Sequence, residues 1–380
     1  MTFSTSKRNK LFTTLAATAM LVTIVTPASA NNMSTLQSAK IKVSNYYKLS
    51  ISSVSDVQKS AKIKTATLNY LNKSLTIKKY ANEKAYLIKR VEAKSHAINK
   101  YYKNNLLETK GQEMSNILSS TNWQGTRVFD KNHQDLTKEN ANFIGLAKYD
   151  GKSGRYEFFD AKTGISRGDT GTFFITNDGK KRILISESLK YQAVVDMIEL
   201  NKDVFTYKRM GKDANGNDVE VFVEHVPYKG KNLSFTSPDK QLDTTTGKII
   251  NNLDGDIILG NTLWNGTKVL DENGNDITMY NTNFISLAKY DKKSNKYEFF
   301  NIATGKSRGD YGYFDIVHEN KIRAHVSIGD NKYGAVLEIT ELNKNKFTYK
   351  RTGKDKEGKD ITVFVEHEPY KGQYKPNFSF

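Results

Sequence analysis

The chain repeats a long stretch of itself, and this duplication constrains its fold more than any other feature. The segment "NWQGTRVFD" at 122–130 returns as "LWNGTKVLD" at 263–271, and "TGISRGD" returns as "TGKSRGD". Trp123 and Trp264 are 141 residues apart and His225 and His367 are 142 apart, so one residue is gained between the copies around 183–191. A repeat of roughly 110 residues is a whole duplicated domain and is too long for a solenoid unit.

Each copy has the pattern of short β-strands. "KYEFF" and "TVFVEHEPY" are rich in aromatic and β-branched residues, and turn signals such as "DGKSG", "NDGK" and "DANGND" separate such runs. In the second copy the pattern predicts eight strands, near 267–271, 284–290, 296–301, 310–318, 321–327, 334–342, 346–352 and 361–368. The short connections favour antiparallel pairing of sequence neighbours, and closure into a barrel removes exposed edges. We therefore expect a mainly β chain with two tandem antiparallel meander barrels; an open two-sheet sandwich is the alternative.

Several segments shared by both copies carry a resemblance. "LAKYD", "YEFF", "SRGD", "FTYKR" and "VFVEH" resemble a tandemly duplicated family of secreted bacterial domains of unknown function, over about 117–232 and 258–374. That resemblance implies no activity. A lone tryptophan at the start of an antiparallel meander is also loosely similar to lipocalins and their calycin relatives, although lipocalins carry Gly-x-Trp where this chain has Thr-Asn-Trp and Thr-Leu-Trp. The second resemblance implies a lipocalin-like barrel, and fold analogy alone assigns no function.

The first thirty residues have the features of a secretory signal. Three cationic residues at 7, 8 and 10 precede an apolar run from Leu11 to Val25, and Ala28-Ser29-Ala30 matches a cleavage site. The chain has no cysteine, so it has neither disulfides nor a thiolate nucleophile. We expect a signal peptide at 1–30, a helical region at 31–115, a first barrel at 116–232, a linker at 233–256 and a second barrel at 257–380. The expected location is secreted, either extracellular or loosely associated with the cell envelope.

Positive charge is concentrated before the repeats. Residues 31–115 contain 16 Lys and Arg against 5 acids, which is most of the net charge of +17. Leu87, Val91 and Ile98 recur at helical spacing with lysines between them, whereas "AKIKTATLNYL" at 61–71 also alternates like a strand. Such a segment suits an anionic wall polymer or membrane surface, and the alternative is a solvated helical face. Nucleic acid is disfavoured because the aromatic residues of the repeats alternate like a β core.

Both repeats contain Arg-Gly-Asp, the tripeptide that integrins recognise on exposed loops. Arg167 and Arg308 follow a Thr-Gly turn and enter an aromatic strand, so we expect a position at the mouth of the barrel and not on a mobile loop. Each guanidinium is predicted to stack on the tryptophan of its own repeat, Trp123 or Trp264. Integrin binding is therefore not the favoured function.

No motif in the sequence predicts catalysis, a metal or a cofactor. His225 and His367 each follow a glutamate on a strand, where adjacent side chains point to opposite faces, and no His or Cys cluster has metal-ligand spacing. The repeated Glu157 and Glu298 have no evident partner, and the calcium-like "DANGND" lacks the final glutamate of a calcium loop. Asn-Gly hairpin turns explain that composition.

Two functions remain from the sequence. The first is a secreted, non-catalytic binding protein in which each barrel takes up a small or amphipathic ligand and the basic segment holds the protein near the envelope. The second is a surface-interaction protein or adhesin that binds host or wall polymer by its outer sheet faces. A cavity above about 300 Å³ would favour the first and a filled interior the second. The candidate ligand-binding residues are Trp123, Arg167, His225, Trp264, Arg308 and His367.

Overall fold

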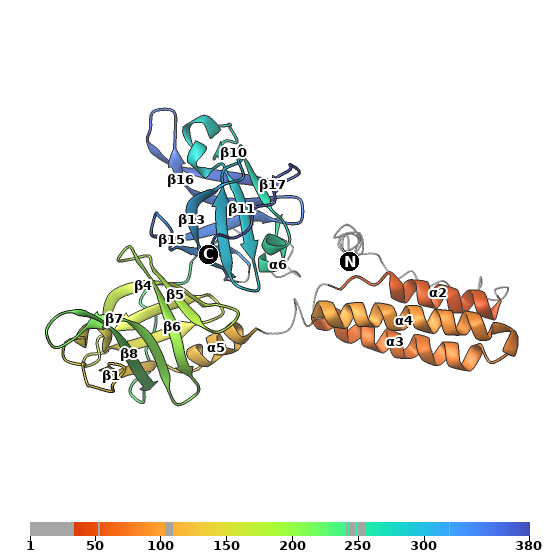
Figure 1. Ribbon diagram of the computed structural model, residues 1–380, viewed down its shortest axis with the longest axis horizontal. Coiled ribbons are helices and arrows are strands. Elements are labelled where there is room, and N and C mark those ends of the chain that lie inside the picture. The colour runs from red at the N-terminus through yellow and green to blue at the C-terminus, as the bar shows by residue number, and fades with distance from the viewer. Residues whose placement is uncertain are drawn as a thin grey trace. The chain divides into compact units, whose positions relative to one another are not determined.

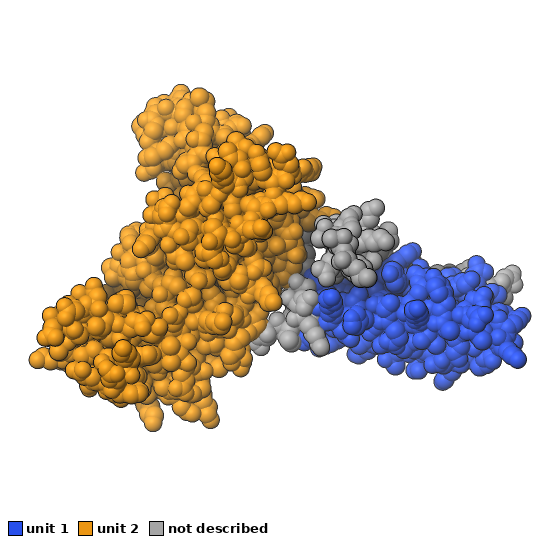
Figure 2. All heavy atoms as spheres, in the orientation of Figure 1, with its two compact units in different colours: residues 1–107 blue, residues 108–380 orange. Residues whose placement is uncertain are grey.

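The computed structural model describes residues 34–51, 54–102, 109–240, 242, 248–249, 255–318 and 320–380 (Figure 1). The chain divides into two compact units, residues 1–107 and 108–380, coloured separately in Figure 2. The expected signal peptide at 1–30 lies outside the described residues. Within the described residues, no helix is both long and apolar enough to span a membrane.

The first unit is helical, as predicted. Its elements are α2 Thr35–Tyr47, α3 Val54–Ser74, the 3-10 turn η2 Lys78–Tyr80 and α4 Ala81–Tyr101. Leu87, Val91 and Ile98 of α4 are buried with Leu71 of α3 in one apolar cluster. The ambiguous stretch at 61–71 is helical because packing of α3 against α2 and α4 overrides its local alternation.

The first repeat is a closed eight-stranded barrel in which every strand pairs antiparallel with its sequence neighbours and β8 returns to β1. Helix α5 Lys110–Ser119 precedes it. The strands are β1 Trp123–Phe129, β2 Leu146–Asp150, β3 Arg155–Phe159, β4 Ser166–Ile175, β5 Lys181–Ser186, β6 Tyr191–Leu200, β7 Phe205–Lys212 and β8 Asp218–Pro227. The 3-10 turn η4 Ala141–Phe143 lies between β1 and β2.

The second repeat has the same topology and closes through the pairing of β10 with β17 and of β14 with β15. Helix α6 Gly255–Gly260 precedes it, and β9 Lys248–Ile249 pairs parallel with β15 outside the meander. The strands are β10 Trp264–Asp271, β11 Leu287–Asp291, β12 Lys296–Phe300, β13 Ser307–Val317, β14 Ile322–Ser327, β15 Tyr333–Leu342, β16 Phe347–Lys354 and β17 Asp360–Pro369, with 3-10 turns η5 Thr278–Tyr280 and η6 Thr282–Phe284. The eight predicted strands and the closed meander are confirmed, and the sandwich alternative is wrong.

The extra residue of the second copy lies in one hairpin. Ser186 and Ser327 end β5 and β14 at a spacing of 141, whereas Tyr191 and Tyr333 begin the next strands at a spacing of 142. The loop at 328–332 is therefore one residue longer than the loop at 187–190, and no strand register has to change.

A helix covers the tryptophan end of each barrel. The indole Nε1 of Trp123 donates to the carbonyl of Leu118 at the end of α5 at 2.8 Å. Trp264 repeats this contact with Leu259 of α6 at 3.1 Å. Both tryptophans are fully buried, so the indole N–H needs this acceptor.

The segment after each barrel, 228–240 after the first and 370–380 after the second, contacts the outer face of the third strand of that barrel. We call each of these segments a strap. Glu157 and Glu298 point outward yet are fully buried, because the strap lies over them. Glu157 accepts from the backbone and hydroxyl of Thr236 at 2.9 and 2.6 Å, and Glu298 accepts from those of Ser379, both at 2.7 Å. The expected linker at 233–256 is thus partly barrel structure: Leu233 is buried against Leu146 and Phe159. These straps are the partners that the sequence did not reveal.

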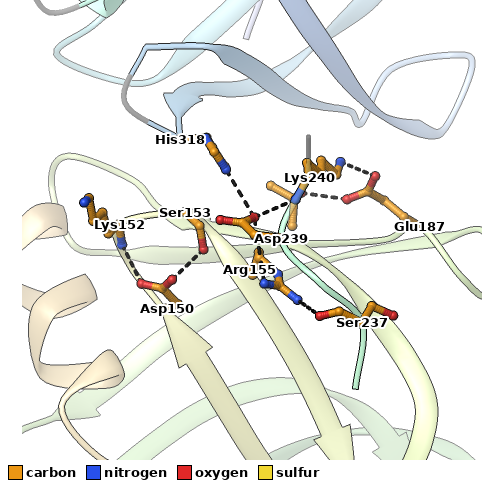
Figure 3. Close-up of polar contacts among 10 residues, drawn as sticks. Asp150, Lys152, Ser153, Arg155, Glu187, Ser237, Asp239, Lys240 and His318 are labelled. Carbon is orange, nitrogen blue, oxygen red and sulfur yellow. Dashed lines mark hydrogen bonds and ion pairs between the residues drawn. The ribbon is translucent and has the colours of Figure 1, made fainter. Parts of the chain in front are cut away.

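The two barrels pack against each other through β4, β5, β13 and β14. The shared apolar cluster consists of Phe174, Ile183 and Ile185 from the first barrel and Val317, Ile322, Ala324 and Val326 from the second. Polar contacts surround it: the amide N–H of Asn177 donates to Oδ1 of Asn295 at 2.5 Å. Figure 3 shows the first strap at this junction, where Asp239 lies between Arg155 and His318, 3.2 Å from the His318 Nε2.

Replacement of Glu298 by alanine tests the strap. The change removes both hydrogen bonds to Ser379, and it should lower the free energy of unfolding of the second barrel by about 1–3 kcal/mol. Urea unfolding followed by tryptophan fluorescence measures this loss. Glu220→Ala is the control, because Glu220 is a largely exposed glutamate paired only with Lys208 at the surface. Equal stabilities for the two variants would contradict a structural role for the strap.

Candidate functional site

The first barrel contains a cavity of about 340 Å³, and Trp123 is not among the residues that line it. Its apolar lining comes from strands β2, β3, β5 and β6, the loop before β2 and the loop before β6, and includes Phe143, Leu146, Phe158, Leu184, Leu189 and Ala193. Its polar lining includes Arg167, Asp169, Arg182, Tyr191, Arg209 and His225. The lining is thus mixed, with apolar and polar side chains in similar number, and the volume lies within the range of small-molecule sites.

Arg182 is the most buried charge in this lining. It is 2% exposed, and its Nη1 donates to the hydroxyl of Tyr149 at 2.5 Å. The guanidinium lies over the ring of Tyr207 at 4.4 Å and that of Phe205 at 5.0 Å, and its Nε has no protein partner. Burial raises the pKa of Tyr149 to about 12, so the tyrosine stays neutral and the arginine keeps its full charge.

Asp169 of the Arg-Gly-Asp tripeptide points into the barrel. It accepts from the hydroxyls of Tyr156, Ser186 and Tyr191 at 2.9, 2.8 and 2.6 Å. Burial raises the pKa of Tyr156 and of Tyr191, so both phenols remain hydrogen-bond donors. The aspartate is 8% exposed, so it lies in the barrel interior and not on an exposed loop.

Arg167 lines the cavity, but the predicted stacking on tryptophan is wrong. Its Nη1 donates to the carbonyl of Asn142 at 3.2 Å, and Arg308 donates to the carbonyl of Asn283 at 3.1 Å. The tryptophans are buried and donate their indole N–H groups to the covering helices. Trp123 contacts Phe205 at a centroid distance of 5.7 Å and is absent from the cavity lining.

His225 also lines the cavity, next to Phe205 and Tyr207. Burial, together with the charge of Arg182, lowers the pKa of His225 to about 3, so the imidazole is neutral at physiological pH. Its Nδ1 has no protein partner. His367 of the second barrel is likewise buried, and burial with the charge of Arg323 lowers its pKa to about 3.

The second barrel repeats this arrangement with polar changes, such as Ser286 in place of Gly145. Arg323 contacts the hydroxyl of Tyr290, lies 4.3 Å from the ring centroid of Tyr349, and has an unpartnered Nε. His325 stands in the strand position of Leu184, and burial lowers its pKa well below 6.5. Of the candidate residues, the structure brings Arg167 and His225 together in one cavity, and places their counterparts Arg308 and His367 in the second barrel.

No sequence motif identified Arg182, Arg323 or His325 as residues of the barrel interiors. A signal was present in "KRILIS": Arg182 alternates with Leu184 on one face of an apolar strand, which places a cation on the same face as a core residue. No group of three or more His, Cys, Asp and Glu suited to a metal occurs among the described residues. The calcium-like loops are hairpin turns: Asp213 accepts the amides of Asn215 and Asn217, and Gly216 has a φ of 81°.

The buried histidines predict that stability falls in acid. The unfolded chain protonates each imidazole near pH 6.5 and the folded chain only near pH 3, so this stabilisation is complete above pH 6.5 and is lost as the pH falls toward 3. Between these two pH values, the free energy of unfolding should fall by about 1.4 kcal/mol per pH unit for each histidine. His225→Phe should remove that slope from the first barrel in urea titrations between pH 6 and 4. His133→Asn, a change at an exposed histidine with a φ of 62°, should leave the slope unchanged, and identical slopes for both variants would contradict the assignment.

Comparison with known proteins gives a family and no activity. No curated protein matches the sequence. Among solved structures, a complex of bovine odorant binding protein with a selenium-containing odorant is 17% identical, covers 31% of this chain and 74% of its own, and has a TM-score of 0.21. A complex of the same bovine protein with undecanal is also 17% identical, covering 30% and 74%, with a TM-score of 0.20. The family model "Domain of unknown function (DUF4822)" matches residues 115–235 and 256–378. These two matches span more than half of the sequence, and the chain belongs to the DUF4822 family.

Proposed function

We propose that this protein is a secreted, non-catalytic binding protein whose barrels take up a small or amphipathic ligand. The observation that carries the proposal is the cavity of about 340 Å³ in the first barrel, which lies within the range of small-molecule sites. Aromatic and aliphatic side chains form one part of its lining, and charged and polar side chains form the rest. A ligand with one polar end and an apolar body matches that division.

Binding by the outer sheet faces is less well supported. The outer faces of β4, β5, β13 and β14 contribute to the shared cluster between the barrels, and the straps cover Glu157 and Glu298 on β3 and β12. Much of the surface that an adhesin would use is therefore already occupied by this chain. The interior of the first barrel is the better candidate.

The side chains of the cavity suit binding better than catalysis. Asp169 is held by three hydroxyl donors, so its oxygens are engaged. His225 has a pKa of about 3, which makes it a poor general base near neutral pH. We therefore assign these groups to ligand recognition.

The proposed location depends on the two N-terminal segments. Secretion follows from the signal-like residues 1–30, and association with the envelope follows from the lysines of the helical unit. Exposed lysines occur on all three long helices, including Lys40, Lys59, Lys62, Lys73, Lys89 and Lys100. An anionic wall polymer or membrane surface is the proposed partner.

Cavity filling tests ligand binding directly. Native mass spectrometry of the protein exported by its own cells should show a bound small molecule. Ala193→Phe places a ring in the cavity and should lower the loaded fraction at least tenfold, whereas Ala214→Phe in an exposed turn should not change it. An exported protein that carries no small molecule, or equal loading of both variants, would argue against this site.

Charge removal tests the envelope association. Substitution of Lys59, Lys62 and Lys73 by glutamine should weaken sedimentation with phosphatidylglycerol vesicles at low salt at least tenfold, since each lysine near an anionic surface contributes about 1 kcal/mol. The matched control removes the same charge from the first barrel, at Lys131, Lys138 and Lys162. Equal loss in the two variants would show that the helical unit has no special role.

A further inference from the structure

We infer that the ligand of the first barrel carries a single anionic group, a carboxylate, which pairs with Arg182 inside the cavity. This inference rests on the proposed function, because it names the class of molecule that the cavity takes up. It goes beyond that function by assigning one residue to the charged end of the ligand and by excluding neutral molecules as the preferred occupants.

The first step is that Arg182 is a buried cation without an acid partner. The ion pairs formed within residues 109–240 involve other lysines and arginines, and none of them includes Arg182. Its Nη1 donates to the hydroxyl of Tyr149, and the guanidinium lies over the rings of Phe205 and Tyr207. These contacts offset only part of the cost of removing a charge from water, which an anion in contact would reduce further.

The second step is that the protein supplies no anion to this place. Tyr149, whose hydroxyl contacts Arg182, stays protonated because its pKa is about 12. Asp169 is the one acid among the residues that line the cavity, and three hydroxyl groups already donate to it. Among the described residues, no carboxylate therefore pairs directly with Arg182.

The third step is that buried nitrogen atoms in the cavity lining have no hydrogen-bond partner in the protein. The Nε of Arg182 and the Nδ1 of His225 are buried, have no protein partner, and belong to residues that line the same cavity. The Nε–H is a donor that a carboxylate oxygen can accept. The imidazole of His225 is neutral, so it adds no second positive charge beside Arg182. Arg167 and Arg209 also line the cavity, but Arg182 is the buried guanidinium of the three, so we assign the carboxylate to it.

The fourth step is the apolar part of the ligand. Phe158, Leu184 and Ala193 form the wall beyond Arg182, and they offer no polar group. A cavity of about 340 Å³ has room for roughly ten non-hydrogen atoms if each takes about the volume share of one water molecule. A short-chain or medium-chain carboxylic acid meets both the charge and the size.

Calorimetric titration with octanoate and with 1-octanol tests the inference. These two probes have the same chain and nearly the same size, and they differ in the charge of the head. We expect octanoate to bind the full-length protein at least tenfold more tightly than 1-octanol at pH 7.5. Arg182→Met keeps an unbranched side chain against Tyr207 and should abolish that preference while 1-octanol still binds. Arg323→Met, the same change in the second barrel, should leave the preference of the first barrel intact.

The outcomes separate the two proposals. Equal affinity of the unmodified protein for both probes would overturn the anionic inference and leave the binding function standing. Failure of both probes to bind, with no small molecule on the exported protein, would overturn the binding function itself. If Arg182→Met does not fold, as judged by tryptophan fluorescence, the comparison of the two probes on the unmodified protein still decides the inference. A preference for octanoate that persists in folded Arg182→Met would also overturn it.

Discussion

The structure of each repeat depends on the pairing of its first strand with its last. Gln124 of β1 lies opposite Val226 of β8, and Asn265 of β10 lies opposite Glu368 of β17, although about a hundred residues separate the partners. This pairing removes both edges of the sheet and turns one face of every strand into an interior. Any side chain at an inward position is then surrounded by protein, whatever its polarity. The burial of Arg182 and His225, and with it the chemistry of the cavity, follows from this closure.

Closure also explains why the interior is not simply apolar. A helix accepts the indole N–H of the tryptophan in each barrel, and charged and polar residues line the cavity of the first. There Asp169 is stabilised by hydroxyl donors, whereas Arg182 is stabilised by aromatic faces. The two opposite charges thus line one cavity without forming an ion pair.

The outer faces have a different role, since this chain uses them for its own assembly. Strand β5 is buried on both sides: Arg182 and Leu184 face the cavity, whereas Ile183 and Ile185 pack against the second barrel. The straps bury Glu157 and Glu298 on outward positions and satisfy both carboxylate oxygens. Duplication therefore produced a two-barrel unit with a shared apolar cluster.

The sequence by itself determined the duplication, the strands and the turns, and it favoured a closed meander over a sandwich, because these follow from repeats, period-two alternation and local turn chemistry. Only the tertiary structure decided which groups meet: Arg182 contacts Tyr149 across 33 residues, and Glu298 contacts Ser379 across 81. Alternation assigns a side chain to a face of a strand but does not identify its neighbours on other strands. The Arg-Gly-Asp tripeptide shows the same limit, since the register of β3, β4 and β5 turns its aspartate inward to three hydroxyl groups that no local motif specifies.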